Sequence, residues 1–261
     1  YLSFKSIAYY ARSFPEDFIL TLRATGKVTG TVSNLSSERL DIRSATGRTQ
    51  ILCGFKLRGL PLVEESTLQV DIDSIHSDMN DLNGILYSIA GTDVRFLEEN
   101  AGSLTPFRFN GRLAGLLTDF AVDGNLDGEF GFVSLDMVMN SNVSPDGVLL
   151  SGIIDTRNLD LGLFTGNPAL GNCSLYTKAS ATFRKGGIRK LNATIDTLYL
   201  TSLVFNDYLF RDFKMQGELR NGLFDGRISA TDPNLHFLIQ GRADLTRTAG
   251  TAANFFANIV Y

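Results

Sequence analysis

Glycine recurs in this chain between two apolar residues, in the pattern apolar-x-Gly-x-apolar. Side chains of a β-strand alternate between its two faces, so a glycine in this pattern lies on the same face as its apolar neighbours. A glycine there leaves a gap in the packed surface and lets the strand bend. The pattern therefore predicts a strongly curved sheet with an apolar inner face, and it surrounds Gly26, Gly30, Gly111, Gly124, Gly128, Gly152, Gly217, Gly226 and Gly241.

Apolar and polar residues alternate with a period of two through most of the sequence, which is typical of half-buried strands. We expect about fifteen strands of moderate length in an antiparallel meander. Asp-Gly and Asn-Gly pairs such as Asn221-Gly222 and Asp225-Gly226 fit hairpin turns or, within the glycine pattern, mid-strand kinks. In one segment the alternation places on a single face Leu191, Ala193, Ile195, Thr197 and Tyr199.

Two segments break the strand rhythm. Residues 78–90 begin with an aspartate that can cap a helix, and apolar residues follow at helical spacing, namely Met79, Leu82, Leu86 and Ile89. Residues 159–171 contain three glycines and Pro168, and they predict a loop insertion. A second short helix is expected within residues 1–13.

Together these patterns predict an all-β fold with one or two short helices. The expected architecture is an elongated, strongly curved antiparallel sheet that forms a trough, or β-taco-like groove, with an apolar interior. Residues 107–126 and 213–228 share a layout of two glycine-containing strands joined by a short link, as expected for repeating units. We expect residues 1–261 to form a single internal segment of a longer repetitive β domain, with any anchor or targeting segment outside it.

Composition argues against several classes of protein. The formal net charge of −4 without a basic patch argues against nucleic acid as a partner, because phosphate backbones bind to clustered positive charge. No stretch approaches the roughly 18 consecutive apolar residues of a membrane-spanning helix. The two cysteines, Cys53 and Cys173, lack metal-ligand spacing, and we interpret them as small buried apolar residues rather than a disulfide.

Few residues suggest catalysis or metal binding. The segment Asp123-Gly124-Asn125-Leu126-Asp127-Gly128 matches the opening of a calcium-binding loop, but the twelfth position is Ser134 instead of a glutamate. Aspartates such as Asp119, Asp155 and Asp160 could pair for glycoside hydrolysis, yet nothing in the sequence fixes their separation. The two histidines, His76 and His236, stand alone in strand-like segments, and we interpret them as outward-facing. We therefore predict that the chain is not an enzyme and binds no cofactor or metal, with turn chemistry as the interpretation of residues 123–128.

The order of several short motifs resembles the TamB translocation and assembly module of diderm bacteria, a relative of the AsmA-like proteins. The resemblance covers most of residues 17–245. It is carried by Phe109-x-Gly111-x-Leu113, Gly115-Leu116-Leu117-Thr118-Asp119-Phe120, Asp123-Gly124, Leu159-Asp160-Leu161-Gly162, Phe224-Asp225-Gly226-Arg227-Ile228, Asp232-Pro233-Asn234-Leu235 and Gly241-Arg242-Ala243-Asp244-Leu245.

The resemblance implies a periplasmic location, with the full-length protein tethered to the inner membrane by a part outside this segment. It also implies a role in moving phospholipid between the two membranes, in outer-membrane biogenesis and in protein secretion. The implied partners are a phospholipid or other acyl-chain lipid and a protein of the outer-membrane assembly machinery. None of these functions requires a catalytic residue.

An apolar concave face can hold acyl chains while its polar outer face meets water. The residues that we expect to line such a lipid groove alternate with polar residues, and they are Phe107, Phe109, Leu113, Val133, Leu135, Met137, Ile195, Phe213, Met215, Leu219, Phe224, Ile228, Leu235, Phe237 and Ile239. Two other functions stay open. One is a structural scaffold or docking module for outer-membrane proteins, with the trough filled by its own side chains. The other is a calcium-stabilised β adhesin.

Overall fold

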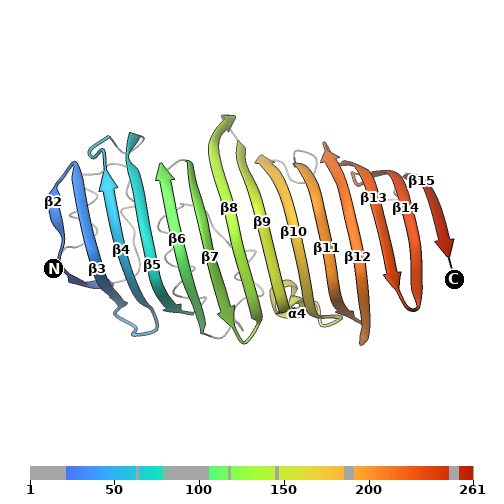
Figure 1. Cartoon of the computed structure of the whole chain (residues 1–261), viewed down its shortest axis with the longest axis horizontal. Coiled ribbons are helices and arrows are strands. Elements are labelled where there is room, and N and C mark those ends of the chain that lie inside the picture. Colours follow the sequence, from blue (N-terminus) through green and yellow to red (C-terminus); the bar gives the residue numbers. More distant parts are fainter. Residues whose placement is uncertain are drawn as a thin grey trace. The chain divides into compact units, whose positions relative to one another are not determined.

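A computed structural model describes the backbone of residues 22–62, 65–78, 81, 106–116, 119–144, 147–184, 191–246 and 253–260. Fifteen strands of this part of the chain lie in one open antiparallel sheet. The order is β1-β3-β4-β5-β6-β7-β8-β9-β10-β11-β12-β13-β14-β15, and β2 pairs with β3 beside this path. Neighbours in the sheet are thus neighbours in the sequence (Figure 1). The predicted all-β fold and antiparallel meander are confirmed.

Strand contacts divide the chain into two compact units. Unit 1 comprises Tyr1–Phe132 and Leu163–Asn167, and unit 2 comprises Val133–Gly162 and Pro168–Tyr261. The strands of unit 1 are β1 (Leu22–Gly26), β2 (Thr29–Thr31), β3 (Asn34–Ser44), β4 (Gln50–Arg58), β5 (Thr67–Ser77), β6 (Phe107–Leu116) and β7 (Asp119–Gly128).

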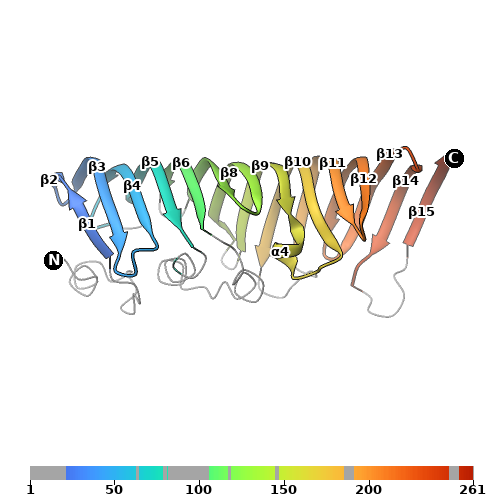
Figure 2. The ribbon, with the colours of Figure 1, turned by 90° about the horizontal axis from the view of Figure 1, so that it is seen from below.

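Unit 2 holds the longer strands. These are β8 (Gly131–Ser144, from Val133 on), β9 (Gly147–Asp160), β10 (Leu170–Arg184), β11 (Asn192–Phe205), β12 (Tyr208–Arg220), β13 (Leu223–Asp232), β14 (Leu235–Asp244) and β15 (Ala253–Val260). A five-residue helix, α4 (Leu161–Thr165), connects β9 to β10 (Figure 2). The segment predicted as a loop insertion over 159–171 therefore consists of the end of β9, this helix and the turn that leads into β10.

Strand pairing sorts the side chains of each unit into an apolar and a polar face. In unit 1, pairing across β3, β4, β5 and β6 aligns Ile42, Ile51, Ile75 and Phe109 in one row. In unit 2, pairing across β11 to β14 aligns Leu198, Met215, Ile228 and Ile239. Exposure alternates along β12 in step with these rows, because every second side chain faces water.

Glycines line up across the strands of both units and form what we call the glycine rows. The row of unit 1 runs Gly26, Leu40, Cys53, Ile72, Gly111 and Gly124. The row of unit 2 runs Gly152, Ala179, Ile195, Gly217, Gly226 and Gly241. Seven of the nine glycines that the motifs singled out thus belong to these two rows, whereas Gly30 pairs with Leu35 and Gly128 with Phe107.

Three strands that carry a large residue in these rows have a β-bulge beside it. The register shifts between Ser37 and Leu40 in β3, between Ile72 and Ile75 in β5, and between Ile195 and Leu198 in β11. A bulge bends its strand and increases the local twist, as a glycine also permits. Most strands of each unit therefore have either a glycine or a β-bulge where they cross the glycine row of that unit.

The bulge in β11 corrects one predicted face. Alternation alone puts Ile195, Thr197 and Tyr199 together, but Ile195 pairs with Gly217 whereas Tyr199 pairs with Lys214. Gly217 and Lys214 lie on opposite faces of β12, so Tyr199 lies on the polar face. The bulge contains one extra residue, and every side chain that follows it changes face.

The turn signals divide into true turns and mid-strand pairs. Asn221-Gly222 forms the predicted two-residue turn between β12 and β13, and both residues have positive φ values, of 53° and 80°. This conformation belongs to the type I′ turn, which favours glycine because of its left-handed backbone. Asp225-Gly226 and Asp123-Gly124 lie inside strands instead.

The predicted helix over 78–90 lies mostly outside the described residues. Its start is visible, since the backbone N–H of Asp81 donates a 2.8 Å hydrogen bond to Oδ1 of Asp78. This is the bond that an N-cap aspartate makes with the third residue of a helix, as the sequence predicts. The second predicted helix, within residues 1–13, also lies outside the described residues.

Candidate functional site

All predicted groove residues lie in described strands, and strand register brings most of the unit 2 residues together. Met215, Ile228 and Ile239 are direct cross-strand neighbours, and Leu219 pairs with Phe224. Ala230 stands between Phe213 and Phe237 in the next row, and the ring centroids of the two phenylalanines are 5.9 Å apart. Ile195 lies beside Gly217, at the glycine row. Val133, Leu135 and Met137 belong to β8, and Phe107, Phe109 and Leu113 to β6 of unit 1.

Leu235 occupies a different position from the rest. It pairs with Asp232 at the end of β14 and keeps 36% of its surface exposed. It is thus at the margin of the apolar face.

The apolar faces are only partly buried. Among the described residues, the buried apolar side chains are Leu40, Cys53, Phe107, Phe130, Cys173 and Ala230. Of the predicted groove residues, Phe107 alone is in this set, and the others keep partial exposure. A filled core would bury most of these side chains completely. The aligned apolar side chains of both units therefore keep part of their surface accessible to solvent.

Phenylalanine rings lie over the glycine pairs of both units. At Gly217, a Cβ atom would come within 2.8 Å of Cζ of Phe224, and at Gly124 within 2.6 Å of Cζ of Phe109. Phe224 precedes Gly226 by two residues in β13 and covers Gly217 of β12. In the same way, Phe109 precedes Gly111 by two residues in β6 and covers Gly124 of β7. The space above the glycines is thus occupied by a flat ring, as in aromatic rescue of glycine in designed sheets.

Two aromatic residues that sequence reasoning missed extend this surface. Tyr208 and Phe210 stack edge to face with ring centroids 4.5 Å apart, and Phe210 lies 6.0 Å from Phe213. Asp212, with a φ of 56°, interrupts the alternation of β12 between them. A simple period of two therefore could not place Phe210 and Phe213 on one face. The Asn206-Asp207 turn, with positive φ at both residues, was the available signal for the register.

A buried aspartate closes one end of the apolar face of unit 2. Asp232 accepts hydrogen bonds from the Tyr208 hydroxyl (2.8 Å) and from the backbone N–H groups of Arg211 and Asn234 (2.9 Å each). The Asn234 bond contributes most to lowering the pKa of Asp232, with further lowering by Tyr208 and Arg211, against the opposing effect of desolvation. Through these hydrogen bonds the Asp232 carboxylate connects the turn between β13 and β14 to Tyr208 and Arg211 of β12.

A similar cluster lies at one end of unit 1. Asp81 is 2% exposed and accepts 2.8 Å hydrogen bonds from the hydroxyls of Thr46 and Thr49 and from the Arg48 guanidinium. Desolvation by burial is the largest single effect and would raise the pKa of Asp81, but the hydrogen bonds from Thr49, Thr46, Ser44 and Arg48 together lower it. The site is satisfied internally, and we assign it a structural role.

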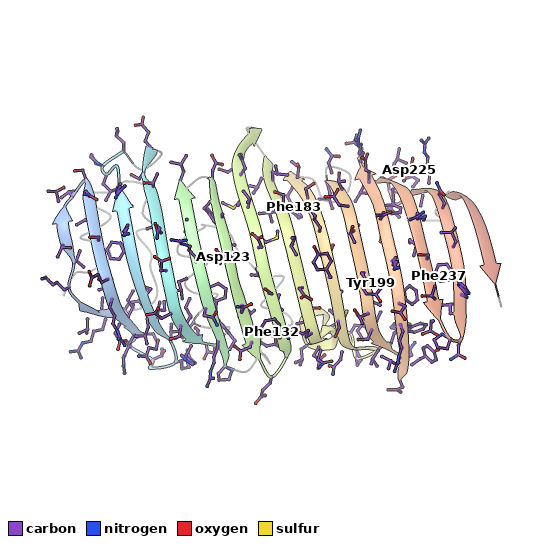
Figure 3. The ribbon with its side chains drawn as sticks, in the orientation of Figure 1. Asp123, Phe132, Phe183, Tyr199, Asp225 and Phe237 are labelled. Carbon is purple, nitrogen blue, oxygen red and sulfur yellow. The ribbon has the colours of Figure 1, made fainter. Side chains whose placement is uncertain are left out.

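The polar face of unit 2 carries most of its charged groups. Arg242 Nε lies 2.6 Å from Oδ2 of Asp225, an exposed pair. The Tyr199 hydroxyl donates a 2.6 Å hydrogen bond to Asp212, and this bond raises the pKa of Tyr199. Lys214 Nζ lies 5.6 Å from the centroid of the Tyr199 ring, within the range of a cation–π contact. Figure 3 labels Tyr199 and Asp225 on this sheet.

The described residues bring no metal-binding group of side chains together. Residues 123–128 lie in β7, where Asp123 pairs with Arg112 and Gly124 with Gly111, so this segment forms neither a calcium loop nor the turn that we expected. No cluster of three or more His, Cys, Asp or Glu side chains with metal-binding geometry occurs in the described part of the chain. Both histidines are exposed, as predicted.

Both cysteines are buried and free, in agreement with the sequence interpretation. Burial raises the pKa of Cys173 to about 11, and burial followed by the charge of Asp73 raises that of Cys53. Helices that the structure describes are all too short or too polar to span a membrane.

No protein-family model, curated protein or solved structure matches this chain. The resemblance to the TamB family therefore stays a prediction from the sequence motifs.

Proposed function

We propose that this chain is a non-enzymatic periplasmic segment of a TamB/AsmA-like protein anchored in the inner membrane. It guides phospholipid along an apolar β groove between the inner and outer membranes and supports outer-membrane biogenesis. Partial exposure of the aligned apolar residues in unit 2 carries the proposal. A scaffold that filled its own interior would bury these residues, whereas a lipid carrier keeps them accessible.

The glycine rows support a groove rather than a flat surface. In a flat sheet a Cβ atom points away from the neighbouring strand. An added Cβ at Gly217 would instead lie 2.7 Å from the Asp225 carbonyl oxygen and 2.9 Å from Cα of Gly226. This convergence is expected where both strands bend toward their apolar face.

The chemistry of the face suits an acyl chain. Aliphatic side chains and edge-to-face rings offer dispersion contacts without a polar group that would fix one lipid in place. Each methylene removed from water contributes about 0.8 kcal/mol, so several methylenes suffice for binding. Because these contacts are similar along the strand rows, a bound chain can shift between them without a deep energy minimum.

Uptake of a fluorescent phospholipid by delipidated protein tests the proposal. We compare Ile228→Lys with the control His236→Lys, because His236 is exposed in the neighbouring strand β14, on the face opposite to Ile228, and lies outside a hollow that opens between β11, β12 and β13. An unpaired charge in an apolar site is strongly unfavourable, so Ile228→Lys should lower uptake at least about tenfold. His236→Lys should leave uptake within about twofold.

Two outcomes contradict the carrier proposal. One is wild-type protein that takes up no lipid at concentrations where a known carrier does. The other is an equal effect of both lysine variants. Native mass spectrometry of protein purified without detergent provides a second readout, since a scaffold would show no co-purifying lipid.

A further inference from the structure

We propose that the polar face of unit 2 carries a binding site for a phosphate group, separate from the apolar face. A hollow of about 410 Å³ opens there between β11, β12 and β13. Six polar-face residues line it, together with the chain at Leu198 and Met215: Thr197, Tyr199, Lys214, Gln216, Arg227 and Ser229. Its polar lining includes two cations, three hydroxyl groups and an amide, and no carboxylate.

The two cations of the hollow are not neutralised by the protein. Lys214 and Arg227 form no ion pair with any residue in the described part of the chain. Arg227 makes a single long hydrogen bond of 3.4 Å to Gln216, and Lys214 lies over the Tyr199 ring. Two cations without an ion-pair partner around one hollow raise the local positive potential, and they favour an anionic ligand.

Nearby acidic groups are engaged elsewhere or lie outside the lining. Asp212 accepts the hydrogen bond of Tyr199, and Asp225 pairs with Arg242 on the far side of β13. Asp196 belongs to the bulge of β11 beside Thr197, and its carboxylate is not part of the lining. The residues that line the hollow therefore carry two positive charges and no negative charge.

The set of donors matches a phosphate group. A guanidinium offers parallel N–H donors to phosphate oxygens, and an ammonium adds a point charge. The Thr197 and Ser229 hydroxyls make no hydrogen bond to the described residues, so both can donate to an oxygen. The Tyr199 ring and its cation–π contact hold Lys214 at the edge of the hollow.

Isothermal titration with inorganic phosphate at low ionic strength tests the site. We expect saturable binding to the wild type and at least a tenfold weaker affinity in the double variant Lys214→Ala/Arg227→Ala. The matched control is Lys56→Ala/Arg58→Ala, which also removes one lysine and one arginine. These two residues lie at exposed positions of β4, in unit 1. The affinity of this control should stay within twofold of the wild type, and circular dichroism should show that both variants keep their strands.

Absence of saturable binding in the wild type overturns the proposal. So does an equal loss in the two double variants, because that result would reflect net charge alone. Flotation with phosphatidylcholine vesicles, with and without phosphatidic acid, identifies the source of the phosphate. Binding to the phosphatidic acid vesicles that requires Lys214 and Arg227 assigns a lipid headgroup, and binding of inorganic phosphate without flotation assigns a soluble phosphate compound.

The test is independent of the lipid-groove proposal. Ile228→Lys changes the apolar face and should leave phosphate affinity within twofold of the wild type. Failure of the groove and failure of the phosphate site therefore give different patterns across the variants.

Discussion

Replacing Gly217 by alanine tests the close approach of strands at the glycine row. In an ordinary strand interior, glycine is less favourable than alanine by about 0.5–1 kcal/mol, so the substitution would stabilise the protein. The geometry at Gly217 predicts the opposite sign. The new methyl group would meet the Asp225 carbonyl oxygen at 2.7 Å, Cζ of Phe224 at 2.8 Å and Cα of Gly226 at 2.9 Å.

The magnitude follows from which atoms must move. The Phe224 ring can shift, but the carbonyl of Asp225 and Cα of Gly226 belong to the backbone of β13. Relief therefore requires separation of two hydrogen-bonded strands, and overpacking of this kind costs about 1–3 kcal/mol. Such a loss lowers the equilibrium constant for folding about fivefold to more than a hundredfold.

Gly171→Ala is the graded control for this substitution. The nearest neighbours of the new methyl group would be the Cβ and Cγ1 atoms of Val204, each at 3.0 Å, and the Val204 carbonyl oxygen would lie at 3.8 Å. We expect a smaller loss, because the closest approach is 3.0 Å at Gly171 and 2.7 Å at Gly217, so the overlap that must be relieved is smaller. Urea unfolding gives the stability change, and hydrogen exchange of the amides in β12 and β13 locates it. If Gly217→Ala stabilises the protein, or leaves exchange in β12 and β13 unchanged, the inferred strand convergence is wrong.

Three further predictions concern other residues. Tyr208→Phe leaves a buried acceptor of Asp232 without its 2.8 Å donor and should destabilise the protein by about 1–3 kcal/mol in urea unfolding, whereas Tyr176→Phe on the polar face should change stability by less than about 0.5 kcal/mol. The pKa values of Asp81 and Asp232 lie below the ordinary value of 3.8, so the stabilisation by both carboxylates is present above that pH and is lost as pH falls through the lower folded pKa values. The midpoint of urea unfolding should drop in this pH range, and it should drop less in Asp81→Asn. An unchanged acid response in that variant would contradict the role of Asp81. Because Cys53 and Cys173 are buried and free, a thiol reagent at pH 8 should modify neither cysteine in the native protein and both cysteines after denaturation. If denatured protein shows no reactive thiol, the two cysteines form a disulfide instead.

Alternation and glycine spacing were sufficient to predict the strands and most of their faces. The glycine pairs also contain register information that a single motif does not show. Gly217 lies four residues before Asn221, and Gly226 lies four residues after Gly222, so a two-residue turn at 221–222 places the glycines opposite each other. The same symmetry relates Gly226 and Gly241 about the turn at 233–234. Reading the turns together with the glycines would have distinguished Asn221-Gly222 from the mid-strand pair Asp225-Gly226.

The bulges could not be predicted from alternation. Around Ile195 the sequence continues with Thr197 and Tyr199, which are compatible with either face, so one extra residue leaves no break in the pattern. The later run Leu198 and Leu200 is the only sign that the apolar face has moved by one position. A similar shift occurs in β12, where Arg211 and Asp212 separate Phe210 from Phe213 and a simple alternation would put the two rings on opposite faces. Such choices depend on pairing with neighbouring strands, which no local pattern contains.

The bulge in β11 links the two faces of unit 2. By shifting the alternation, it keeps Leu198 in line with Met215 and Ile228 on the apolar face. The same shift places Thr197 and Tyr199 on the polar face, where they border the hollow with Lys214. Without the extra residue, Thr197 and Tyr199 would interrupt the apolar row, and the hollow would lose a hydroxyl and its aromatic wall. One backbone irregularity is therefore required by both proposals, although the ligands that test them bind to opposite sides of the sheet.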